Sequence, residues 1–196
     1  MNRSFPKAEA AATALVLMDF QPAVLAGLSD FDTTELLDRA ENAVSWARAN
    51  SVRVAHVRVA FTNADLAAIP DRNRAFSVLK GGGILKEGSP ECEIVDALKP
   101  EPHDIAVRKT RFGSFSTTHL HLQLREAGVQ SLVLAGVTTS GVVLSTVRDG
   151  ADKDLGLYVL SDACADGDPE VHRVLVDKVF PQQAHVIGTA QLGDLF

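Results

Sequence analysis

Short runs of apolar residues alternate along the chain with segments of helical periodicity. Residues 14–18 read Ala-Leu-Val-Leu-Met, and residues 132–137 form a second run without a charged side chain. Continuous runs of this kind are typical of strands buried on both faces of a parallel sheet. Apolar and β-branched patterning predicts further strands at residues 52–61, 104–108, 157–161 and 184–187.

Helix signals stand between these strands. Asp32-Thr33-Thr34-Glu35 is typical of a helix start, and apolar residues follow at near-helical spacing until Asn50. Further helices are predicted at residues 91–98, 117–127, 141–153 and from Pro169 onward. The alternation predicts an α/β protein, a three-layer α/β/α Rossmann-like fold with a six-stranded parallel sheet. We expect a single domain over residues 1–196. Residues 62–90 fit neither pattern, which predicts a lid or binding element.

Composition and net charge exclude some classes of binding partner. Hydrophobic residues make up 46% and charged residues 22% of the chain, as in soluble globular proteins. Nineteen basic against twenty-five acidic residues give a net charge of −6, which argues against nucleic acid and anionic membranes as partners. The two cysteines, Cys92 and Cys164, form neither a disulfide framework nor a metal knuckle. We therefore expect reduced thiols and a cytoplasmic protein.

Three strand ends carry candidate chemistry. Ligands of open α/β sheets bind beyond the carboxyl ends of the strands, which selects Asp19, Lys109 and residues 136–140. A carboxylate–ammonium pair there suits general acid–base chemistry, although a capping Asp and a surface Lys would have the same sequence. The turn after residue 136 would offer helix N-terminal amides to an oxyanion or a carboxylate. The same residues also suit an ordinary turn capped by Thr139 or Ser140.

Four motifs make the pattern specific. They are Leu-Met-Asp-Phe-Gln around Asp19, Val-Arg-Lys-Thr-Arg-Phe-Gly-Ser-Phe around Lys109, Leu-Ala-Gly-Val-Thr-Thr-Ser-Gly-Val ending at Val142, and Val-Leu-Ser-Asp-Ala-Cys-Ala-Asp. In order and spacing the chain resembles the isochorismatase-like (cysteine hydrolase) superfamily over about residues 13–188. The resemblance implies a homodimer or homotetramer and a cis peptide near residues 137–138. The candidate substrate- and oxyanion-binding residues are Phe20, Gln21, Phe115, Thr138, Thr139 and Gly141.

One position departs from the family pattern. Amidases of the family use an Asp–Lys–Cys triad, and the motif places the cysteine at Val142, which cannot act as a nucleophile. We interpret Cys92 and Cys164 as structural. Three interpretations stay open: a hydrolase without a covalent step, like family isochorismatases that cleave a vinyl ether; Ser140 or Ser145 as nucleophile; or a catalytically inactive small-molecule-binding or scaffold protein.

The first of these interpretations is the one we expect. Asp19 would be the general acid or base, and Lys109 its electrostatic partner, in hydrolysis of an amide or vinyl ether bond of a small molecule. Family nicotinamidases hold a metal with histidines before the lid, but residues 57–73 contain no histidine, so we expect no metal and no cofactor. Arg58 or Arg111 would hold a substrate carboxylate, and Phe61 and Phe112 would flank the pocket mouth, although ordinary packing and surface roles suit these residues equally well.

Overall fold

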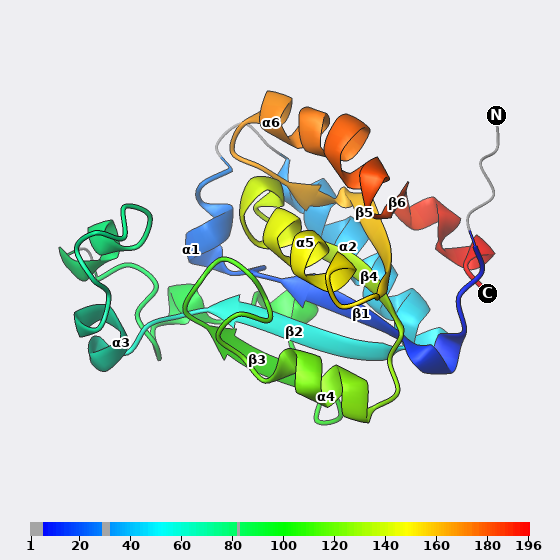
Figure 1. Ribbon diagram of the computed structural model, residues 1–196, viewed down its shortest axis with the longest axis horizontal. Coiled ribbons are helices and arrows are strands. Elements are labelled where there is room, and N and C mark those ends of the chain that lie inside the picture. The colour runs from blue at the N-terminus through cyan, green and yellow to red at the C-terminus, as the bar shows by residue number, and fades with distance from the viewer. Residues whose placement is uncertain (1–5, 29–31, 82) are drawn as a thin grey trace.

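In a computed structural model, which describes residues 6–28, 32–81 and 83–196, six parallel strands form one sheet. The strand order is β3-β2-β1-β4-β5-β6, so the order reverses between β1 and β4 (Figure 1). The strands are β1 (Thr13–Met18), β2 (Arg53–Val59), β3 (Ile105–Lys109), β4 (Ser131–Val137), β5 (Gly156–Ala165) and β6 (His185–Ile187). The predicted six-stranded parallel sheet is confirmed.

Helices cover both faces of the sheet, as a parallel sheet requires. The helix α2 lies behind the sheet in Figure 1, while α4 and α5 lie in front. The α-helices are α1 (Pro22–Leu25), α2 (Thr33–Ala49), α3 (Asn63–Ala67), α4 (Leu120–Glu126), α5 (Leu144–Ala151) and α6 (Pro169–Val174). Among the described residues, no helix is both long and apolar enough to cross a membrane.

The apolar run in β1 serves two separate cores. Leu15 and Leu17 pack with α2, whereas Val16 and Met18 pack with α4 and α5 on the opposite face. Successive side chains of a strand point to opposite faces of the sheet. When helices cover both faces, every side chain of the strand is therefore buried. The unbroken apolar run of the sequence is the consequence.

The predicted start of α2 is confirmed in detail. The Asp32 carboxylate accepts hydrogen bonds from the amides of Thr34 and Glu35, at 2.9 and 3.3 Å. These two amides have no acceptor inside the helix, so the side chain satisfies them. The helix ends at Asn50, as expected.

Several predicted boundaries are wrong. Residues 91–98 form two 3₁₀ turns, Pro90–Cys92 and Asp96–Leu98, instead of one helix, because Glu93 is extended and the Val95 amide bonds the Phe20 carbonyl. The helix expected from residue 141 begins with a π-helical turn, Thr139–Val143. The helix expected from residue 117 begins only at Leu120. The fifth strand continues to Ala165, so Cys164 lies inside it and not beyond it.

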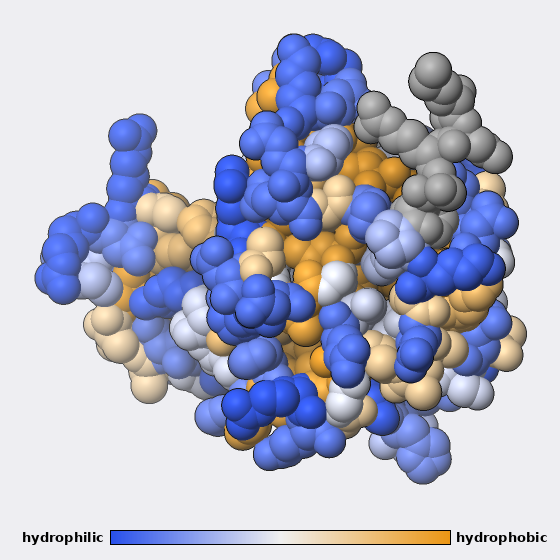
Figure 2. Space-filling model, turned by 45° about the vertical axis from the view of Figure 1, so that its right-hand side comes forward, coloured by the Kyte–Doolittle hydropathy of each residue, from blue (hydrophilic) through white to orange (hydrophobic). Residues whose placement is uncertain are grey.

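Residues 62–81 and 83–90 form an arm that projects from the body beside the ends of β1 and β2 (Figure 1). It holds α3 and the 3₁₀ turn Ser77–Gly81, and its apolar side chains pack with Val59 and Phe61 at the end of β2. In the space-filling view its upper part stands clear of the body (Figure 2). The arm therefore has a small core of its own, formed by Val59, Phe61, Ile69 and Phe76.

Gly136 in β4 allows a close approach between β1 and β4. A Cβ at this position would lie 2.8 Å from both the Cβ and the carbonyl oxygen of Met18. We expect Gly136→Ala to lower the free energy of unfolding by about 1–3 kcal/mol, because the two strands must separate to admit the methyl group. Denaturant unfolding measures this change. Gly81→Ala is the control, since its Cβ would meet no atom within 4 Å, and equal unfolding midpoints for the two variants would contradict the prediction.

Candidate active site

Asp19 and Lys109 meet at the carboxyl end of the sheet. Asp19 directly follows β1 and Lys109 ends β3, with β2 between them. Lys109 Nζ lies 2.7 Å from Asp19 Oδ2, and the two side chains are only 3% and 6% exposed. The Lys109 ammonium also donates a hydrogen bond to the Arg111 carbonyl oxygen at 3.1 Å. The predicted charge pair is therefore formed, and it is buried.

The backbone holds the Asp19 carboxylate in place. Asp19 has φ of 59°, a left-handed conformation that is uncommon for a residue other than glycine. Its amide donates to the Val57 carbonyl at 2.8 Å, and its own carbonyl accepts from the Gln21 amide at 2.8 Å. Hydrogen bonds on both sides compensate for the strained backbone. Such strain is concentrated at functional sites.

Burial dominates the electrostatics of Asp19. Desolvation raises the pKa of Asp19 to about 6, although the Lys109 charge and hydrogen bond act in the opposite direction. Its second oxygen, Oδ1, is buried and has no hydrogen-bond partner among the described residues. A buried carboxylate oxygen without a partner is costly, so this acceptor is available to a water or a substrate.

The turn after β4 is clamped from one side by two residues that we did not predict. The Ser140 amide donates to Asp166 Oδ2 at 2.7 Å, and Thr139 Oγ1 and His172 Nδ1 share a hydrogen bond of 2.8 Å. Because the fifth strand was expected to end at residue 161, Asp166 was not recognised as a strand-end residue. His172 lies on α6, and nothing in the sequence places it beside Thr139.

The turn itself runs from a cis peptide between Val137 and Thr138, as expected, into the π-helical turn. The Gly141 amide donates to the Oγ1 and the carbonyl oxygen of Thr138, each at 3.2 Å. With the Ser140 amide held by Asp166, two amides of the turn are already occupied by protein groups. Among the first helical amides, that of Val142 is the candidate donor to an oxyanion, because Val142 lines the cavity next to the charge pair, whereas Thr139 does not.

A cavity of about 220 Å³ joins the charge pair to the turn and the arm. Asp19 and Lys109 line it together with Thr138, Gly141 and Val142. The arm and neighbouring segments supply its other walls, which are Val24, Val59, Ala75, Phe76, Leu79, Leu85, Arg111, Phe112 and Val137. Val142, which we predicted to stand at the position of the family cysteine, therefore faces the cavity.

Other predicted site residues lie outside this lining. Phe20 packs in the core on the α2 face, and Phe115 packs on the opposite face against His121. The Gln21 amide group joins two segments: it accepts from the Val59 amide and donates to the carbonyl oxygens of Val59 and Cys92. None of these three side chains lines the cavity, and neither does the buried Thr139.

The alternative nucleophiles are also placed away from the cavity. Ser140 is exposed, and the Ser145 hydroxyl donates to the Gly141 carbonyl at 2.7 Å. Cys92 and Cys164 are fully buried, and burial raises the pKa of both thiols, to about 12 for Cys164. None of these four residues lines the cavity. In the described part of the chain, no group of three or more His, Cys, Asp or Glu residues is arranged to hold a metal ion.

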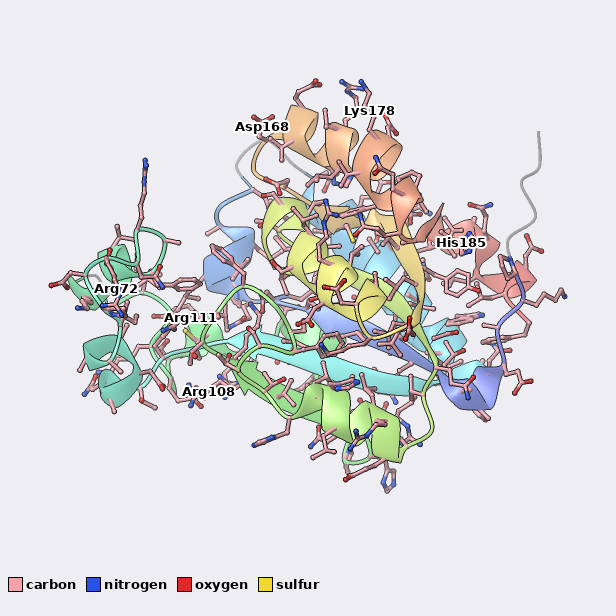
Figure 3. The ribbon with its side chains drawn as sticks, viewed as in Figure 1. Arg72, Arg108, Arg111, Asp168, Lys178 and His185 are labelled. Atoms are coloured by element: carbon pink, nitrogen blue, oxygen red, sulfur yellow. The ribbon has the colours of Figure 1, made fainter. Side chains whose placement is uncertain are left out.

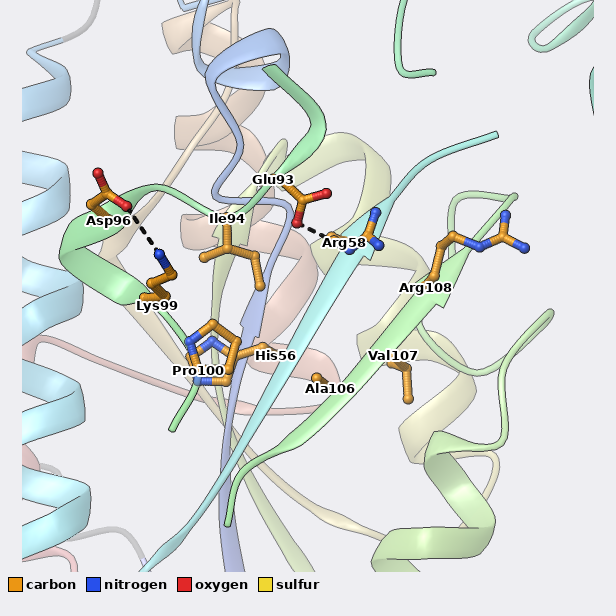
Figure 4. A pocket seen from close by; sticks show the side chains of 10 residues that line it. All are labelled: His56, Arg58, Glu93, Ile94, Asp96, Lys99, Pro100, Ala106, Val107 and Arg108. Atoms are coloured by element: carbon orange, nitrogen blue, oxygen red, sulfur yellow. Dashed lines mark ion pairs between the residues drawn. The ribbon is translucent and has the colours of Figure 1, made fainter. Parts of the chain in front are cut away.

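A larger hollow of about 510 Å³ lies elsewhere, at the β2–β3 edge (Figure 4). The cationic side chains that line it all have carboxylate partners: Arg58 pairs with Glu93 at 4.0 Å, Lys99 with Asp96 at 3.7 Å, and Arg108 with Asp65 at 2.8 Å. Arg58 also forms two hydrogen bonds with Glu87, so it does not reach the mouth of the 220 Å³ cavity as expected. Because the arginine and lysine side chains of this hollow are paired and the hollow lacks the Asp19–Lys109 pair, we assign the chemistry to the smaller cavity.

The protein is an α/β protein with a parallel sheet and a buried carboxylate–ammonium pair beyond the ends of its strands. Sequence comparison identifies its family. The family model described as the isochorismatase domain matches residues 13–191. The chain therefore belongs to the isochorismatase family. Its family and its relatives place it among the hydrolases.

Individual proteins of known sequence or structure are similar to this chain. Ureidoacrylate amidohydrolase RutB of Acinetobacter baylyi is 30% identical over 181 residues, which cover 82% of this chain and 74% of that protein. RutB of Methylorubrum extorquens is 31% identical over 180 residues, covering 82% and 73%. An isochorismatase family protein from Burkholderia thailandensis has a TM-score of 0.80 at 25% identity, covering 98% of this chain and 99% of that one. The fold is also that of a cysteine hydrolase from Pseudomonas syringae, with a TM-score of 0.85 at 21% identity, covering 100% and 98%.

The raised pKa of Asp19 predicts a pH-dependent stability. Between the ordinary value of 3.8 and about 6, the folded state binds the Asp19 proton and the unfolded state does not. The contribution of Asp19 to stability is thus greatest below 3.8 and is lost as pH rises through this window. We expect the free energy of unfolding of the wild type, relative to Asp19→Asn, to fall by roughly 3 kcal/mol over it.

Denaturant unfolding at a series of pH values measures this difference. Asp38→Asn makes the same chemical change at an exposed position of α2 and is the control. Parallel pH dependences of the wild type and Asp19→Asn would show that Asp19 titrates as an ordinary carboxyl group, against the prediction.

The position of Val142 predicts the reactivity of an introduced thiol. In Val142→Cys the new side chain would face the cavity, whereas both native thiols are buried and have a raised pKa. Since the thiolate is the reactive form, we expect iodoacetamide to modify the folded variant at least about tenfold faster than the wild type. Mass spectrometry of the alkylated protein measures the rate. A variant as inert as the wild type would place residue 142 away from the cavity.

Proposed function

We propose that the protein hydrolyses a carbon–nitrogen bond of a small amide with Asp19 as general base and without a covalent enzyme intermediate. The observation that carries the proposal is the buried Asp19–Lys109 pair, whose free Oδ1 belongs to a residue lining the 220 Å³ cavity. Similarity to amidohydrolases supports the choice of an amide. Valine at the position predicted for the cysteine supports direct attack by water, because a valine side chain cannot act as a nucleophile.

The reaction needs one proton carrier. The Asp19 carboxylate takes a proton from a water molecule while the water oxygen attacks the amide carbonyl carbon. Asp19 then passes the proton to the departing nitrogen, and the carbon–nitrogen bond breaks to give an acid and an amine. A pKa of about 6 suits this role, because the group is mostly ionised at pH 7 and still holds a proton well enough to return it.

Lys109 and the turn after β4 support this chemistry. The Lys109 ammonium, 2.7 Å from Asp19, opposes the desolvation of the carboxylate and keeps it ionised near neutral pH. The amide of Val142, a residue of the cavity lining, would donate a hydrogen bond to the oxyanion that forms at the carbonyl. Thr138 and Gly141 line the same wall of the cavity.

Two other functions follow from particular observations. A vinyl ether would need Asp19 as proton donor, and a pKa of about 6 leaves about one in ten of these groups protonated at pH 7. A binding protein without catalysis would be consistent with valine at the nucleophile position. The pH dependence of turnover distinguishes a vinyl ether hydrolase from an amidase. The absence of turnover would identify a binding protein.

A hydrolysis screen of the purified protein tests the proposal. Substrates are ureidoacrylate, simple aliphatic and aromatic amides, and isochorismate as the vinyl ether. We expect turnover of an amide, with kcat/KM that rises with pH through about 6, because the base must be ionised. Asp19→Asn, verified to be folded, should lose about a hundredfold or more of the rate.

Other outcomes are equally informative. Turnover of isochorismate with kcat/KM that falls above pH 6 would replace the base with an acid and the amide with a vinyl ether. Turnover that Asp19→Asn retains would remove Asp19 from the mechanism. A folded wild type that hydrolyses none of these compounds would favour the binding protein.

A further inference from the structure

We infer that the cavity selects molecules that carry one carboxylate group, and that the Arg111 guanidinium binds that group. This deepens the proposed function by naming the substrate class. The binding step itself needs no catalysis, so it can be tested even if the protein hydrolyses nothing.

The charges of the cavity wall are unbalanced. Among the residues that line it, Asp19, Lys109 and Arg111 are the charged ones. Asp19 and Lys109 neutralise each other at 2.7 Å. Arg111 then leaves the cavity with one net positive charge. A ligand with a single negative charge restores neutrality, whereas a neutral or cationic ligand does not.

Arg111 has no carboxylate partner in the described part of the chain, although neighbouring arginines do. Arg108, three residues earlier, pairs with Asp65 at 2.8 Å, and Arg58 pairs with Glu87 at 2.7 Å. The described contacts of the Arg111 guanidinium are one hydrogen bond from Nη1 to the Thr110 carbonyl at 2.5 Å and the Phe76 ring. A guanidinium has five N–H donors, so most of the fork is left for a ligand.

The position of Arg111 is set by the catalytic pair and by the arm. Its carbonyl oxygen accepts the Lys109 hydrogen bond at 3.1 Å, which fixes its main chain beside the charge pair. The guanidinium carbon lies 5.1 Å from the centre of the Phe76 ring, a cation–π contact with the arm. Figure 3 shows Arg111 between the arm and the body. The side chain is half-buried, so water screens its charge only partly.

The size and lining of the cavity limit the rest of the ligand. A volume of about 220 Å³ lies below the range of roughly 300–1,000 Å³ of pockets for drug-sized molecules, so the ligand must be small. Apart from the three charged residues and Thr138, the side chains of the lining are apolar or absent. The ligand is therefore a short apolar body with one carboxylate, and the scissile amide of a substrate would lie in the same body.

Titration calorimetry with two isosteric pairs tests the inference without turnover. Butyrate is compared with 1-nitropropane, and benzoate with nitrobenzene, because a nitro group has the shape of a carboxylate but no net charge. We expect the wild type to bind each carboxylate at least about tenfold more tightly than its nitro partner, as a charge-assisted bidentate contact implies. Arg111→Gln should remove this preference, and Arg111→Lys should retain part of it.

The matched control is Arg72→Gln, which removes the same charge from an exposed position on the arm and should leave the preference unchanged. Equal binding of carboxylate and nitro partners, a preference that survives Arg111→Gln, or no binding of either carboxylate to folded protein would each overturn the inference. Carboxylate selectivity in a protein that shows no hydrolysis would uphold the inference while refuting the proposed function. Hydrolysis of neutral amides without carboxylate selectivity would do the reverse.

Discussion

The ion pair between Asp19 and Lys109 joins two strands that are not neighbours in the sheet. β1 and β3 are separated by β2, yet their carboxyl ends are linked by a contact of 2.7 Å in a nearly water-free site. Taking two charges out of water is expensive, and their attraction repays the cost only with good geometry. Such a pair is weak evidence for stability. Its retention beside a cavity is understandable if the charges serve chemistry.

Hydrogen bonds around the Asp19–Lys109 pair lower the desolvation cost of burying it. The main chain of Arg111 gives the ammonium a second acceptor, and the hydrogen bonds of the Asp19 backbone to Val57 and Gln21 hold the carboxylate at the strand end. One carboxylate oxygen is left without a partner. The site also differs from the larger hollow at the β2–β3 edge in having a lining arginine without a carboxylate partner among the described residues, whereas the lysine and arginines of that hollow are paired.

The arm and the turn after β4 complete the site from opposite sides. The arm brings Phe76 to the cavity and places it under the Arg111 guanidinium. Across the cavity, Asp166 and His172 hold the turn that carries Val142. In a family whose amidases are expected to use a thiol at this position, the same frame here surrounds a valine. In the proposed mechanism, water takes the place of the thiol as nucleophile, and the Asp19 carboxylate acts as its base.

The sequence by itself determined the parallel sheet and the strand-end positions of Asp19 and Lys109. Unbroken apolar runs require strands covered on both faces, and the carboxyl ends of parallel strands lie at one edge of the sheet, so a charge pair was predicted there. The strand order, with only β2 between β1 and β3, is what brings the two side chains into contact. Local signals also sufficed for the cap of α2. The boundaries at residues 91–98 and 157–161 were wrong, because hydrogen bonds to distant segments, such as Val95 to Phe20, decide them.

Only the tertiary structure decided which side chains face the cavity. Phe20, Gln21 and Phe115 stand in the right motifs, but their side chains pack away from it or hold the main chain of other segments. Asp166 and His172 reach the turn only because β5 and α6 lie beside β4 in space. Whether the Arg111 guanidinium is open to a ligand likewise depends on packing, which places no carboxylate of the described residues beside it. Local patterns record which residues are apolar or charged, whereas long-range packing decides what each of them touches.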